Sequence, residues 1–472
     1  MSATPITVRS RLGAASLLSH APTRAAKPLA DPPPGSGLKP VMGERGLPVV
    51  GNTFPIVYDT VAQARERYER YGAVSWSNVL RTDFVLVLGP EAIGEVFANR
   101  DKAFSSEQGW EHFIGPFFRG GLMLMDFDEH LRHRRIMQQA FKSDRLESYL
   151  QHMNPVIDRE LAGLQPGGEL QFHTAMKRMT LGIANEVFLG ERIGSECDRL
   201  NKAFIDLVAG GQAIVRRDVP GGKWRRGSRG RALLVEYFEA RIPGKRSDPS
   251  DDLFSVLCRA EDEEAGRLTD KEIVDHLVFA MMAAHDTSTA TLSTMALQLA
   301  RNPEWQRRLH AESAALGADD LRRDQIEQLT SIDLVFKESL RISPPAGMLG
   351  RMAIKDTQIA GHYVPAGTQL MLGLYPSHLM EPWWNDPERF DPERFTPERA
   401  EDKRIKNVWM PFGGFAHKCL GMHFAGMEVK SIMHKLLLRF EIRVDDDYVP
   451  VTDYGTGPFP GDGLPLRLVP RN

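Results

Sequence analysis

Apolar residues occur on all sides of the segment 269–303, which predicts a long helix that crosses a protein core. Thr269 and Glu272 stand three residues apart before the apolar run, with the spacing of a capping box. Asn302 and Pro303 supply the cap and the first turn of a following helix. The residues in between number about thirty and predict a helix roughly 45 Å long at the usual rise per residue.

The remainder of the chain is also predicted to be mostly helical. Helical periodicity extends from about Glu91 to Arg341, whereas residues 84–89 predict a strand and residues 356–372 predict two short strands. Residues 382–404 are irregular and rich in proline, and segments of this kind are usually functional or firmly held. We expect residues 31–472 to form one domain, mainly α with a small β region, after a disordered segment 1–30.

The composition narrows the class of protein. The chain has 472 residues, 42% of them hydrophobic, and a net charge of -3, which is ordinary for a globular protein and does not favour nucleic-acid binding. Three widely separated cysteines imply no disulfide framework and indicate a cytoplasmic protein. No apolar run approaches the roughly 20 residues that span a bilayer. The basic segment 221–231 predicts a solvated loop or, alternatively, a peripheral contact with a membrane.

Two polar residues, Asp286 and Thr287, follow two alanines at the centre of the long helix. One interpretation is a satisfied polar patch, because a threonine hydroxyl can donate to the carbonyl oxygen one turn earlier. The other is a gap between small residues, where a flat ligand approaches the backbone beside an acid and an alcohol that relay protons. The residues alone leave both interpretations open.

The loop "PFGGFAHKCLG", residues 411–421, contains Cys419 directly before a predicted helix. Its glycines allow the backbone to approach a cofactor, and a position at a helix N-terminus favours the thiolate form. These features indicate a metal ligand. The alternatives are a buried small residue and a zinc ligand acting with His417 or His423. Zinc is disfavoured because structural zinc takes four ligands and the other cysteines are distant in sequence.

The same loop resembles the haem-binding loop of the cytochrome P450 superfamily. The resemblance implies that Cys419 is the axial thiolate ligand of haem b and that Phe412, His417 and Gly421 also bind the cofactor. A thiolate donates electron density to the iron and thereby favours cleavage of the O–O bond of dioxygen. The implied fold is an α-rich triangular prism, with the haem between the long central helix and the helix after the cysteine loop.

Other segments resemble motifs of the family in the family's order. In "AAHDTST", Asp286 and Thr287 match the acid and the alcohol of oxygen activation, and Ala283 is implied to lie against the haem. Two departures accompany the resemblance. Phe415 stands where the family usually has glycine, which predicts strain if the turn requires a positive φ. Ala284 replaces a frequent glycine in the long helix.

Structural and binding roles are implied for further residues. The family has a Glu–Arg pair, three residues apart on one helical face, which a later arginine joins to hold the irregular segment. Its haem propionates bind to basic side chains. In this sequence the pair and its partner are Glu338, Arg341 and Arg394, the propionate ligands are His130, Arg134 and Arg351, and the substrate pocket consists of Trp110, Phe113, Phe117, Phe279, Met348 and Pro458.

The resemblance implies a haem-thiolate monooxygenase that hydroxylates a bulky lipophilic molecule, such as a sterol, a terpenoid or a fatty acid. Because the chain has no Walker loop and no strand-associated GxGxxG, electrons are expected from a ferredoxin-type protein with a separate NAD(P)H-dependent reductase. Arg132, His133, Arg135 and Lys418 predict a basic surface for that acidic partner. The alternatives are a haem-thiolate isomerase, dehydratase or peroxygenase, and a non-catalytic protein that binds haem or a lipophile.

Overall fold

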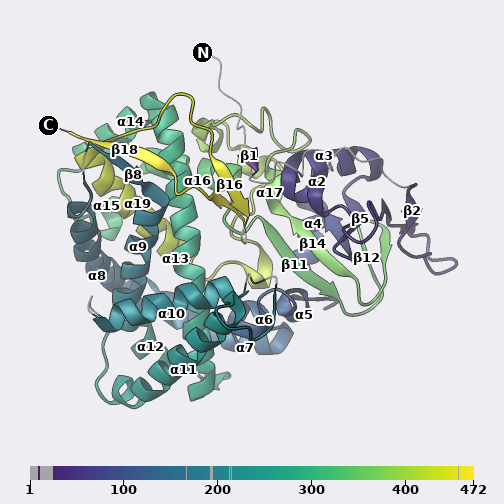
Figure 1. Cartoon of the computed structure of the whole chain (residues 1–472), viewed down its shortest axis with the longest axis horizontal. Helices are drawn as coiled ribbons and strands as arrows, with labels where there is room; N and C mark the ends of the chain where they lie inside the picture. The colour runs from purple at the N-terminus through teal and green to yellow at the C-terminus, as the bar shows by residue number, and fades with distance from the viewer. Residues whose placement is uncertain are drawn as a thin grey trace. The chain divides into compact units, whose positions relative to one another are not determined.

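The computed structural model describes residues 9–10, 25–165, 167–191, 195–211, 213, 215–454 and 457–471 (Figure 1). Most of the segment 1–30, which was predicted to be disordered, lies outside these residues. The chain divides into two compact units. Unit 1 comprises Met1–Gly109, Lys337–Cys419 and Asp447–Asp462, and unit 2 comprises Trp110–Phe336, Leu420–Asp446 and Gly463–Asn472. The expectation of a single domain over residues 31–472 stays a prediction.

A seven-stranded sheet forms the core of unit 1, with strands in the order β2-β4-β5-β6-β14-β11-β7. Strand β6 confirms the strand predicted at residues 84–89. Its side chains are buried on both faces, because Val85 packs with Ile93 of helix α4 and Leu86 packs with Ala64 of helix α3. The strands are β2 (Lys27–Pro28), β4 (Met42–Glu44), β5 (Val74–Val79), β6 (Thr82–Val87), β7 (Phe104–Ser105), β11 (Met348–Ala353) and β14 (Gln369–Gly373).

Smaller elements complete unit 1. Residues 356–372, predicted to hold two strands, contain β12 and β13 and the start of β14, because a second tight turn follows the first. The other elements of this unit are α2 (Thr53–Tyr58), α3 (Thr60–Tyr71), α4 (Pro90–Ala98), α17 (Leu374–His378), α18 (Glu401–Arg404), the 3₁₀ turns η4 (Pro392–Phe395) and η5 (Phe415–His417), and the strands β1 (Arg9–Ser10), β3 (Lys39–Pro40), β12 (Thr357–Ile359), β13 (His362–Val364), β16 (Val451–Tyr454) and β17 (Pro458–Pro460). Two of the unit boundaries fall within helices, namely α5 (Ser106–Glu111) and α16 (Thr330–Ile342).

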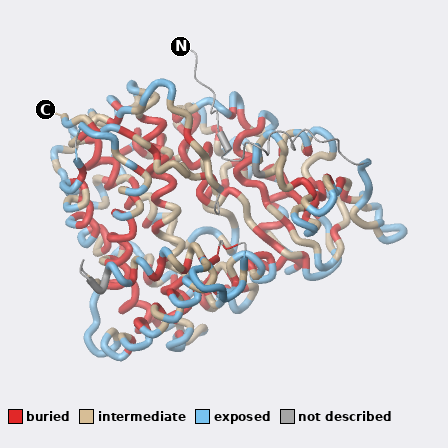
Figure 2. The backbone as a smooth tube through the Cα atoms, in the orientation of Figure 1, coloured by how far each residue is buried: buried red, intermediate tan, exposed pale blue. Residues whose placement is uncertain are grey.

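Unit 2 is built around the long helix α13 (Asp270–Arg301), as the pattern predicted. The capping box of Thr269 and Glu272 is present, and the helix ends at Asn302. Most of α13 is buried, in agreement with its apolar residues on all sides (Figure 2). Helices α9 (Phe172–Ala184), α11 (Lys223–Ser247), α12 (Leu253–Arg259) and α19 (Met422–Arg439) pack against it (Figure 1).

Further helices, turns and strands make up the rest of unit 2. The described helices include none with the apolar length that a bilayer crossing requires. The elements are α6 (Gly115–Phe118), the 3₁₀ turns η1 (Leu122–Leu124) and η2 (Gln139–Phe141), α7 (Phe127–Gln138), α8 (Ser143–Ala162), the π-helical turn η3 (Asn185–Leu189), α10 (Ser195–Gly211), α14 (Pro303–Ala315), α15 (Arg323–Ile326), and the strands β8 (Glu169–Gln171), β9 (Glu261–Asp262), β10 (Gly266–Arg267), β15 (Phe440–Arg443) and β18 (Pro465–Pro470).

Two glycines allow α10 and α11 to pack closely. A Cβ atom added at Gly227 would lie 2.7 Å from the Cα atom of Gly210, and one added at Gly210 would lie 2.8 Å from Gly227. Both distances are too short for any larger residue without movement of the helices. The ring of Phe117 fills the space beside this crossing, within 3.1 Å of the position that a Gly227 Cβ would take.

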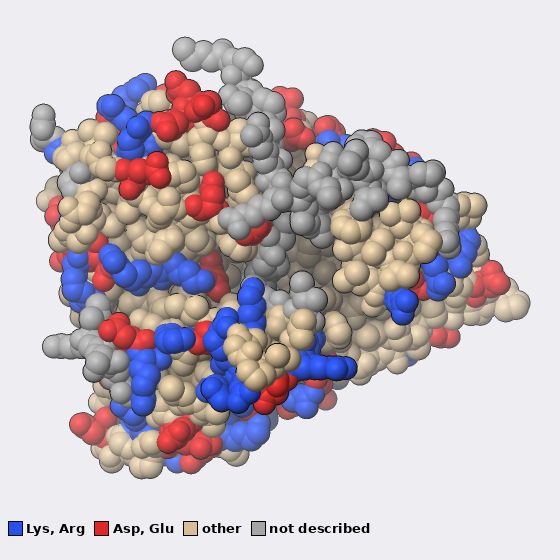
Figure 3. Space-filling view, viewed as in Figure 1, with Lys and Arg blue, Asp and Glu red and all other residues tan. Residues whose placement is uncertain are grey.

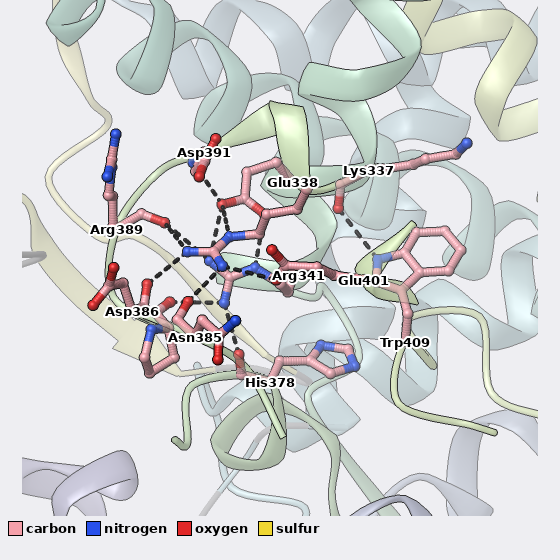
Figure 4. Close-up of polar contacts among 12 residues, drawn as sticks. Lys337, Glu338, Arg341, His378, Asn385, Asp386, Arg389, Asp391, Glu401 and Trp409 are labelled. Atoms are coloured by element: carbon pink, nitrogen blue, oxygen red, sulfur yellow. Dashed lines mark hydrogen bonds and ion pairs between the residues drawn. The ribbon is translucent and has the colours of Figure 1, made fainter. Parts of the chain in front are cut away.

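A fully buried ion cluster organises the irregular segment of unit 1 (Figure 4). Arg341 donates from Nε to Glu338 at 2.7 Å and from Nη2 to the other oxygen of the same carboxylate at 2.9 Å. Arg394 Nε lies 3.5 Å from Glu338, and Arg394 Nη1 lies 3.0 Å from Glu401. Other guanidinium N–H groups donate to the backbone carbonyl oxygens of His378 and of residues 385–389. The cluster therefore fixes a segment that has little regular structure.

Substitution of Arg341 by leucine tests how much this cluster stabilises the fold. The change leaves the Glu338 carboxylate buried with a missing partner, so we expect the free energy of unfolding to fall by about 3–5 kcal/mol. Urea unfolding of the full chain measures it. The control is Arg443→Gln, which removes an exposed ion pair with Glu441 and is expected to leave the free energy of unfolding almost unchanged. Equal effects of the two variants would show that Glu338 does not depend on Arg341.

Candidate active site

The loop before Cys419 is held by its own backbone. The Cys419 N–H donates to Phe412 O at 2.8 Å, and the Gly413 N–H donates to Met410 O at 3.0 Å. Gly413 adopts a φ of 66°, in the left-handed region that glycine enters without strain. Cys419 is exposed, whereas Cys258 is buried, and burial raises the pKa of the Cys258 thiol to about 11. Cys419 is therefore the better placed of these two thiols to act as a thiolate ligand.

Phe415 is a strained residue within this loop. Its φ is 53°, in the left-handed region, which costs a residue with a Cβ about 1–2 kcal/mol. The strain predicted for this departure from the family pattern is therefore present. The side chain is 46% exposed, and the Lys406 ammonium lies 5.8 Å from its ring centroid.

The donor set around Cys419 does not fit a metal that takes all its ligands from the protein. Among the described residues, no group of three or more His, Cys, Asp or Glu side chains is arranged to hold a metal ion. The zinc alternative with His417 or His423 therefore has no support in this part of the chain. A single thiolate fits a metal that carries its other ligands with it, as the iron of a haem does.

The middle of α13 is less buried than the helix on either side of it, and several of its residues are small. Phe279, Ala280, Ala283 and Thr287 are half-buried, although most of the helix on either side is fully buried. The Thr287 hydroxyl donates to Ala283 O at 2.7 Å, the bond expected for a satisfied threonine in a helix. The structure thus shows the satisfied threonine of the first interpretation, and the ligand gap of the second interpretation stays a prediction.

Asp286 is held as a carboxylate. The Lys177 ammonium of α9 lies 2.8 Å from its Oδ1, and His285 Nε2 lies 3.2 Å from the same oxygen. Burial by itself raises the pKa of Asp286, but His285 and Lys177 together outweigh burial and keep the pKa below its ordinary value. Nothing in the local sequence pattern indicated Lys177, because it lies on a different helix.

Helix α7 carries His130, which is buried, and Arg134, which is half-buried, one turn apart as predicted for propionate binding. Between them, His133 Nδ1 lies 2.7 Å from His276 Nε2 of α13. Burial lowers the pKa of both imidazoles, that of His276 to about 3, so the pair is neutral. This histidine pair was not predicted, since its members are far apart in sequence.

The predicted basic surface is wrong for His133, which is 1% exposed. Arg132 is also engaged within the chain, at 2.9 Å from Glu272, and Arg135 forms an ion pair with Glu264. The β9–β10 turn supplies Glu264 and covers this side of α7, which the helical pattern did not reveal. Of the four residues, only Lys418 is an exposed cation with no ion pair to another described residue.

The basic segment 221–231 is not a loop from Lys223 onward but the first part of α11. Arg225 pairs with Asp218 at 3.3 Å, Arg226 with Asp206 at 3.2 Å and Arg231 with the buried Asp275 at 2.8 Å. Basic and acidic side chains are likewise interspersed over the face of the molecule drawn in Figure 3. These ion pairs neutralise part of the positive charge that the sequence placed in the segment 221–231.

The remaining predicted site residues fall into two sets, one in each unit. Arg351 of β11 is buried and donates from Nη1 to Gly350 O at 2.7 Å, and Met348 begins the same strand. Pro458, at the start of β17, is buried. In unit 2, the rings of Trp110 and Phe113 meet edge to face at 6.2 Å. In the same unit, Phe117 meets Trp224 at 4.9 Å, and the half-buried Phe279 lies against Gly121.

The family model for cytochrome P450 matches residues 41–457 of this chain. The chain belongs to the cytochrome P450 family. It is 44% identical over 451 residues to putative cytochrome P450 136 of Mycobacterium tuberculosis, an alignment that covers 94% of this chain and 92% of that protein. Identity is 25% to taxane 10-beta-hydroxylase of Taxus cuspidata, over 93% of this P450 and 91% of the relative. Identity is 26% to sterol 14alpha-demethylase of Mycolicibacterium vanbaalenii, over 82% of this P450 and 87% of that protein.

Solved structures of the family have the same fold. Retinoic acid bound cyanobacterial CYP120A1 superposes with a TM-score of 0.81 at 25% identity, over 90% of this P450 and 98% of that chain. The cytochrome P450DA heme domain superposes with a TM-score of 0.80 at 21% identity, over 89% of this P450 and 94% of that chain. The predicted family, fold class, enzyme class and cofactor are confirmed: this P450 is a monooxygenase of a family whose haem has a cysteine thiolate ligand.

The Lys177–Asp286 ion pair should stabilise the fold to an extent that depends on pH. We expect Lys177→Met to lower the free energy of unfolding by less than about 1 kcal/mol near neutral pH, because each partner is about one-third exposed. A carboxylate with a depressed pKa stabilises the fold above its unfolded pKa, and that contribution disappears as pH falls through the folded pKa. The difference between wild type and variant should therefore shrink as the pH falls from neutral to acidic values below the ordinary pKa of an aspartate, about 3.9.

Urea unfolding at both pH values measures this difference. Lys202→Met is the control, because Lys202 pairs with Asp206 on an exposed turn of α10. A destabilisation by Lys177→Met that stayed constant with pH would mean that Lys177 stabilises the fold through packing rather than through the charge of Asp286.

Proposed function

We propose that Cys419 is the axial ligand of the haem in this P450 and that the enzyme oxidises bulky lipophilic molecules. The observation that carries the proposal is the position of Cys419, an exposed thiol at the end of a glycine-containing, strained loop, in a family whose haem is bound by one cysteine thiolate. When bound, haem supplies activation of dioxygen, which the thiolate promotes by electron donation.

Several side chains suit the other contacts of the cofactor. Basic or hydrogen-bonding groups bind propionate carboxylates well, and small or flat residues pack against a macrocycle. We assign the propionates to His130, Arg134, Arg351 and His417, and the faces of the ring to Phe412, Ala283 and Gly421.

Asp286 and Thr287 are proposed to move the protons that oxygen activation consumes. Because the Lys177 ammonium contacts Asp286 Oδ1, the ion pair disfavours protonation of this carboxylate, and loosening of the pair favours it. Thr287 in turn must release Ala283 O before its hydroxyl can donate elsewhere. In the resting state, both residues are therefore engaged within the chain. They pass protons only when these contacts are released, which restricts proton flow outside turnover.

The substrate class is supported by the residues proposed to line the pocket, Trp110, Phe113, Phe117, Phe279, Met348 and Pro458, which are apolar or aromatic. The relatives named for a sterol and a taxane, and the structure that holds retinoic acid, have lipophilic ligands. Electrons are proposed to come from a ferredoxin-type protein with a separate NAD(P)H-dependent reductase. Lys418 is the exposed cation next to Cys419 that an acidic donor would meet.

Titration of the haem-loaded ferric protein with cholesterol, β-ionone and palmitic acid tests the substrate class. A lipophilic ligand displaces water from the iron, so at least one compound should give a saturable shift towards high spin. Phe279→Ala should raise its Kd about five- to thirtyfold, because loss of an aromatic contact is equivalent to about 1–2 kcal/mol. Phe415→Ala, which removes an exposed ring outside the proposed pocket, should leave the Kd unchanged. No shift with any of the three compounds would contradict a lipophilic substrate.

A further inference from the structure

Helix α7 is joined to α13 by a buried histidine pair that neither the proposed relay nor the proposed pocket uses. His133 Nδ1 of α7 lies 2.7 Å from His276 Nε2 of α13, and the ring centroids are 5.0 Å apart. The two residues are 1% and 0% exposed, and both helices belong to unit 2. Helix α7 has 12 residues, a length at which a helix is only marginally stable by itself in water, so it depends on contacts of this kind.

The neighbours of the pair assign its hydrogen atoms. Arg132 Nη1 lies 3.0 Å from His133 Nε2, and because an arginine only donates, His133 Nε2 accepts and the hydrogen of His133 is on Nδ1. His133 therefore donates to His276 Nε2, and the hydrogen of His276 is on Nδ1. That Nδ1 is buried and has no hydrogen-bond partner among the described residues. Two apolar side chains would fill this space without an unpaired N–H group, so packing alone does not explain the pair.

The charges around the pair keep both imidazoles neutral. Burial is the largest cause and lowers the pKa of both, that of His276 to about 3. Arg132 lowers both further, whereas Glu272 raises both and Glu129 raises that of His133. Glu272 Oε1 lies 3.3 Å from His133 Nε2, but it also accepts from Arg132 at 2.9 Å. A proton on His133 would thus bring a second positive charge next to the Arg132 guanidinium.

Charged groups on the elements packed against α7 and α13 are engaged with other partners. These contacts are Arg246 of α11 with Asp270, Arg231 of α11 with Asp275, Lys245 of α11 with Asp252, Arg267 of β10 with Glu261 of β9, Arg135 with Glu264 of the β9–β10 turn, Lys177 of α9 with Asp286, and Glu428 of α19 with Ser288. The charges that act on the histidine pair are therefore mainly those of α7 and of the first turn of α13.

His133 lies on the side of α7 next to the one that carries His130 and Arg134. Successive side chains are about 100° apart around a helix, so His133 stands about 60° from His130 and about 100° from Arg134. A contact that fixes His133 against α13 therefore also fixes the direction of the other two side chains. Arg132 supports the same arrangement, because it pairs with Glu272 and donates to the carbonyl oxygens of residues 265 and 267.

We propose that His133 and His276 are positioning residues for haem binding: their hydrogen bond holds α7 against α13 and so keeps His130 and Arg134 directed at the propionates. The proposal rests on the propionate contacts proposed for His130 and Arg134. When α7 separates from α13, water reaches both imidazoles and their pKa returns to an ordinary value of about 6.5. Each imidazole then takes up a proton below that pH.

Separation of the two helices should become easier as the pH falls. Above about pH 6.5 the imidazoles are neutral in both states, so the pair holds fully. Below that pH the separated state binds up to two more protons, and the separation equilibrium rises up to about 100-fold per pH unit. Glu272, whose pKa is lowered, adds its own dependence only below the ordinary value of a glutamate, about 4.3. Measurements above about pH 5 therefore report the histidines.

Amide hydrogen exchange of the haem-loaded full chain measures the separation. After correction for the intrinsic exchange rate, protection of the α7 amides should fall up to about 100-fold between about pH 6.5 and about pH 5.5. The double variant His133→Leu, His276→Met fills the space with apolar groups and should lose this dependence. His276→Gln, whose amide oxygen still accepts from His133, should keep the protection at neutral pH and reduce the dependence to about tenfold. The exposed His152→Gln should behave as wild type.

Transfer of haem from the ferric protein to excess apomyoglobin measures the consequence for the cofactor. Wild type should release haem increasingly faster below about pH 6.5, whereas the double variant should show a smaller increase. The Cys419 thiolate is present in both proteins, so the difference between them reports the histidine pair. The proposal is overturned by equal pH dependence of haem release in the two proteins, by wild-type α7 protection that does not change with pH, or by protection that changes equally in the double variant. If the double variant does not fold, His276→Gln decides.

Arg134→Ala and His130→Ala separate this proposal from the proposed function. If either variant releases haem several-fold faster while wild-type α7 protection is independent of pH, the propionate contacts stand and the positioning proposal is wrong. If both variants release haem at the wild-type rate, the propionate contacts are wrong, and the positioning proposal fails with them even where α7 protection depends on pH.

Discussion

One buried carboxylate, that of Glu338, fixes the part of unit 1 that leads to the cysteine loop. It accepts from Arg341 and from the Asp391 N–H, and the guanidinium of Arg394 lies beside it. Each of the two arginines also donates to carbonyl oxygens of the irregular segment. Because a buried charge without its partner costs several kcal/mol, this segment cannot separate from α16 while the unit remains folded. The residues that lead to Cys419 therefore begin at a fixed position, where the Met410 N–H donates to His378 Nε2.

In unit 2, the long helix imposes a second constraint. Three consecutive residues near its centre face different neighbours, so each has a different electrostatic environment. Lys177 keeps Asp286 ionised, Thr287 is satisfied by the helix backbone, and Ser288 donates to Glu428, whose pKa is raised by burial. A buried helix can thus hold polar side chains in different environments at its centre without disturbing its own hydrogen bonds.

Features that depend on residues close in sequence were predictable. Periodicity gave α13 with its capping box and gave β6, and the loop around Cys419 carried enough local signal to indicate the family. The ion pair between Lys177 and Asp286 and the contact between His133 and His276 were not predictable, because in each case the two residues lie on different helices. The prediction that His133 lies on a basic surface was wrong for the same reason, since His133 is buried against His276 of a distant helix. Glu428 had a weak signal, as a carboxylate on an apolar helix face.

The central claim is that Cys419 supplies the thiolate of this P450, and the carbon monoxide complex of the reduced, haem-loaded protein tests it most directly. Wild type and Cys258→Ser should show the absorption band of a thiolate-ligated haem, because Cys258 is buried and holds its proton. Cys419→Ser should lose that band, since a serine hydroxyl does not replace a thiolate. A thiolate-type band retained in Cys419→Ser would contradict the account.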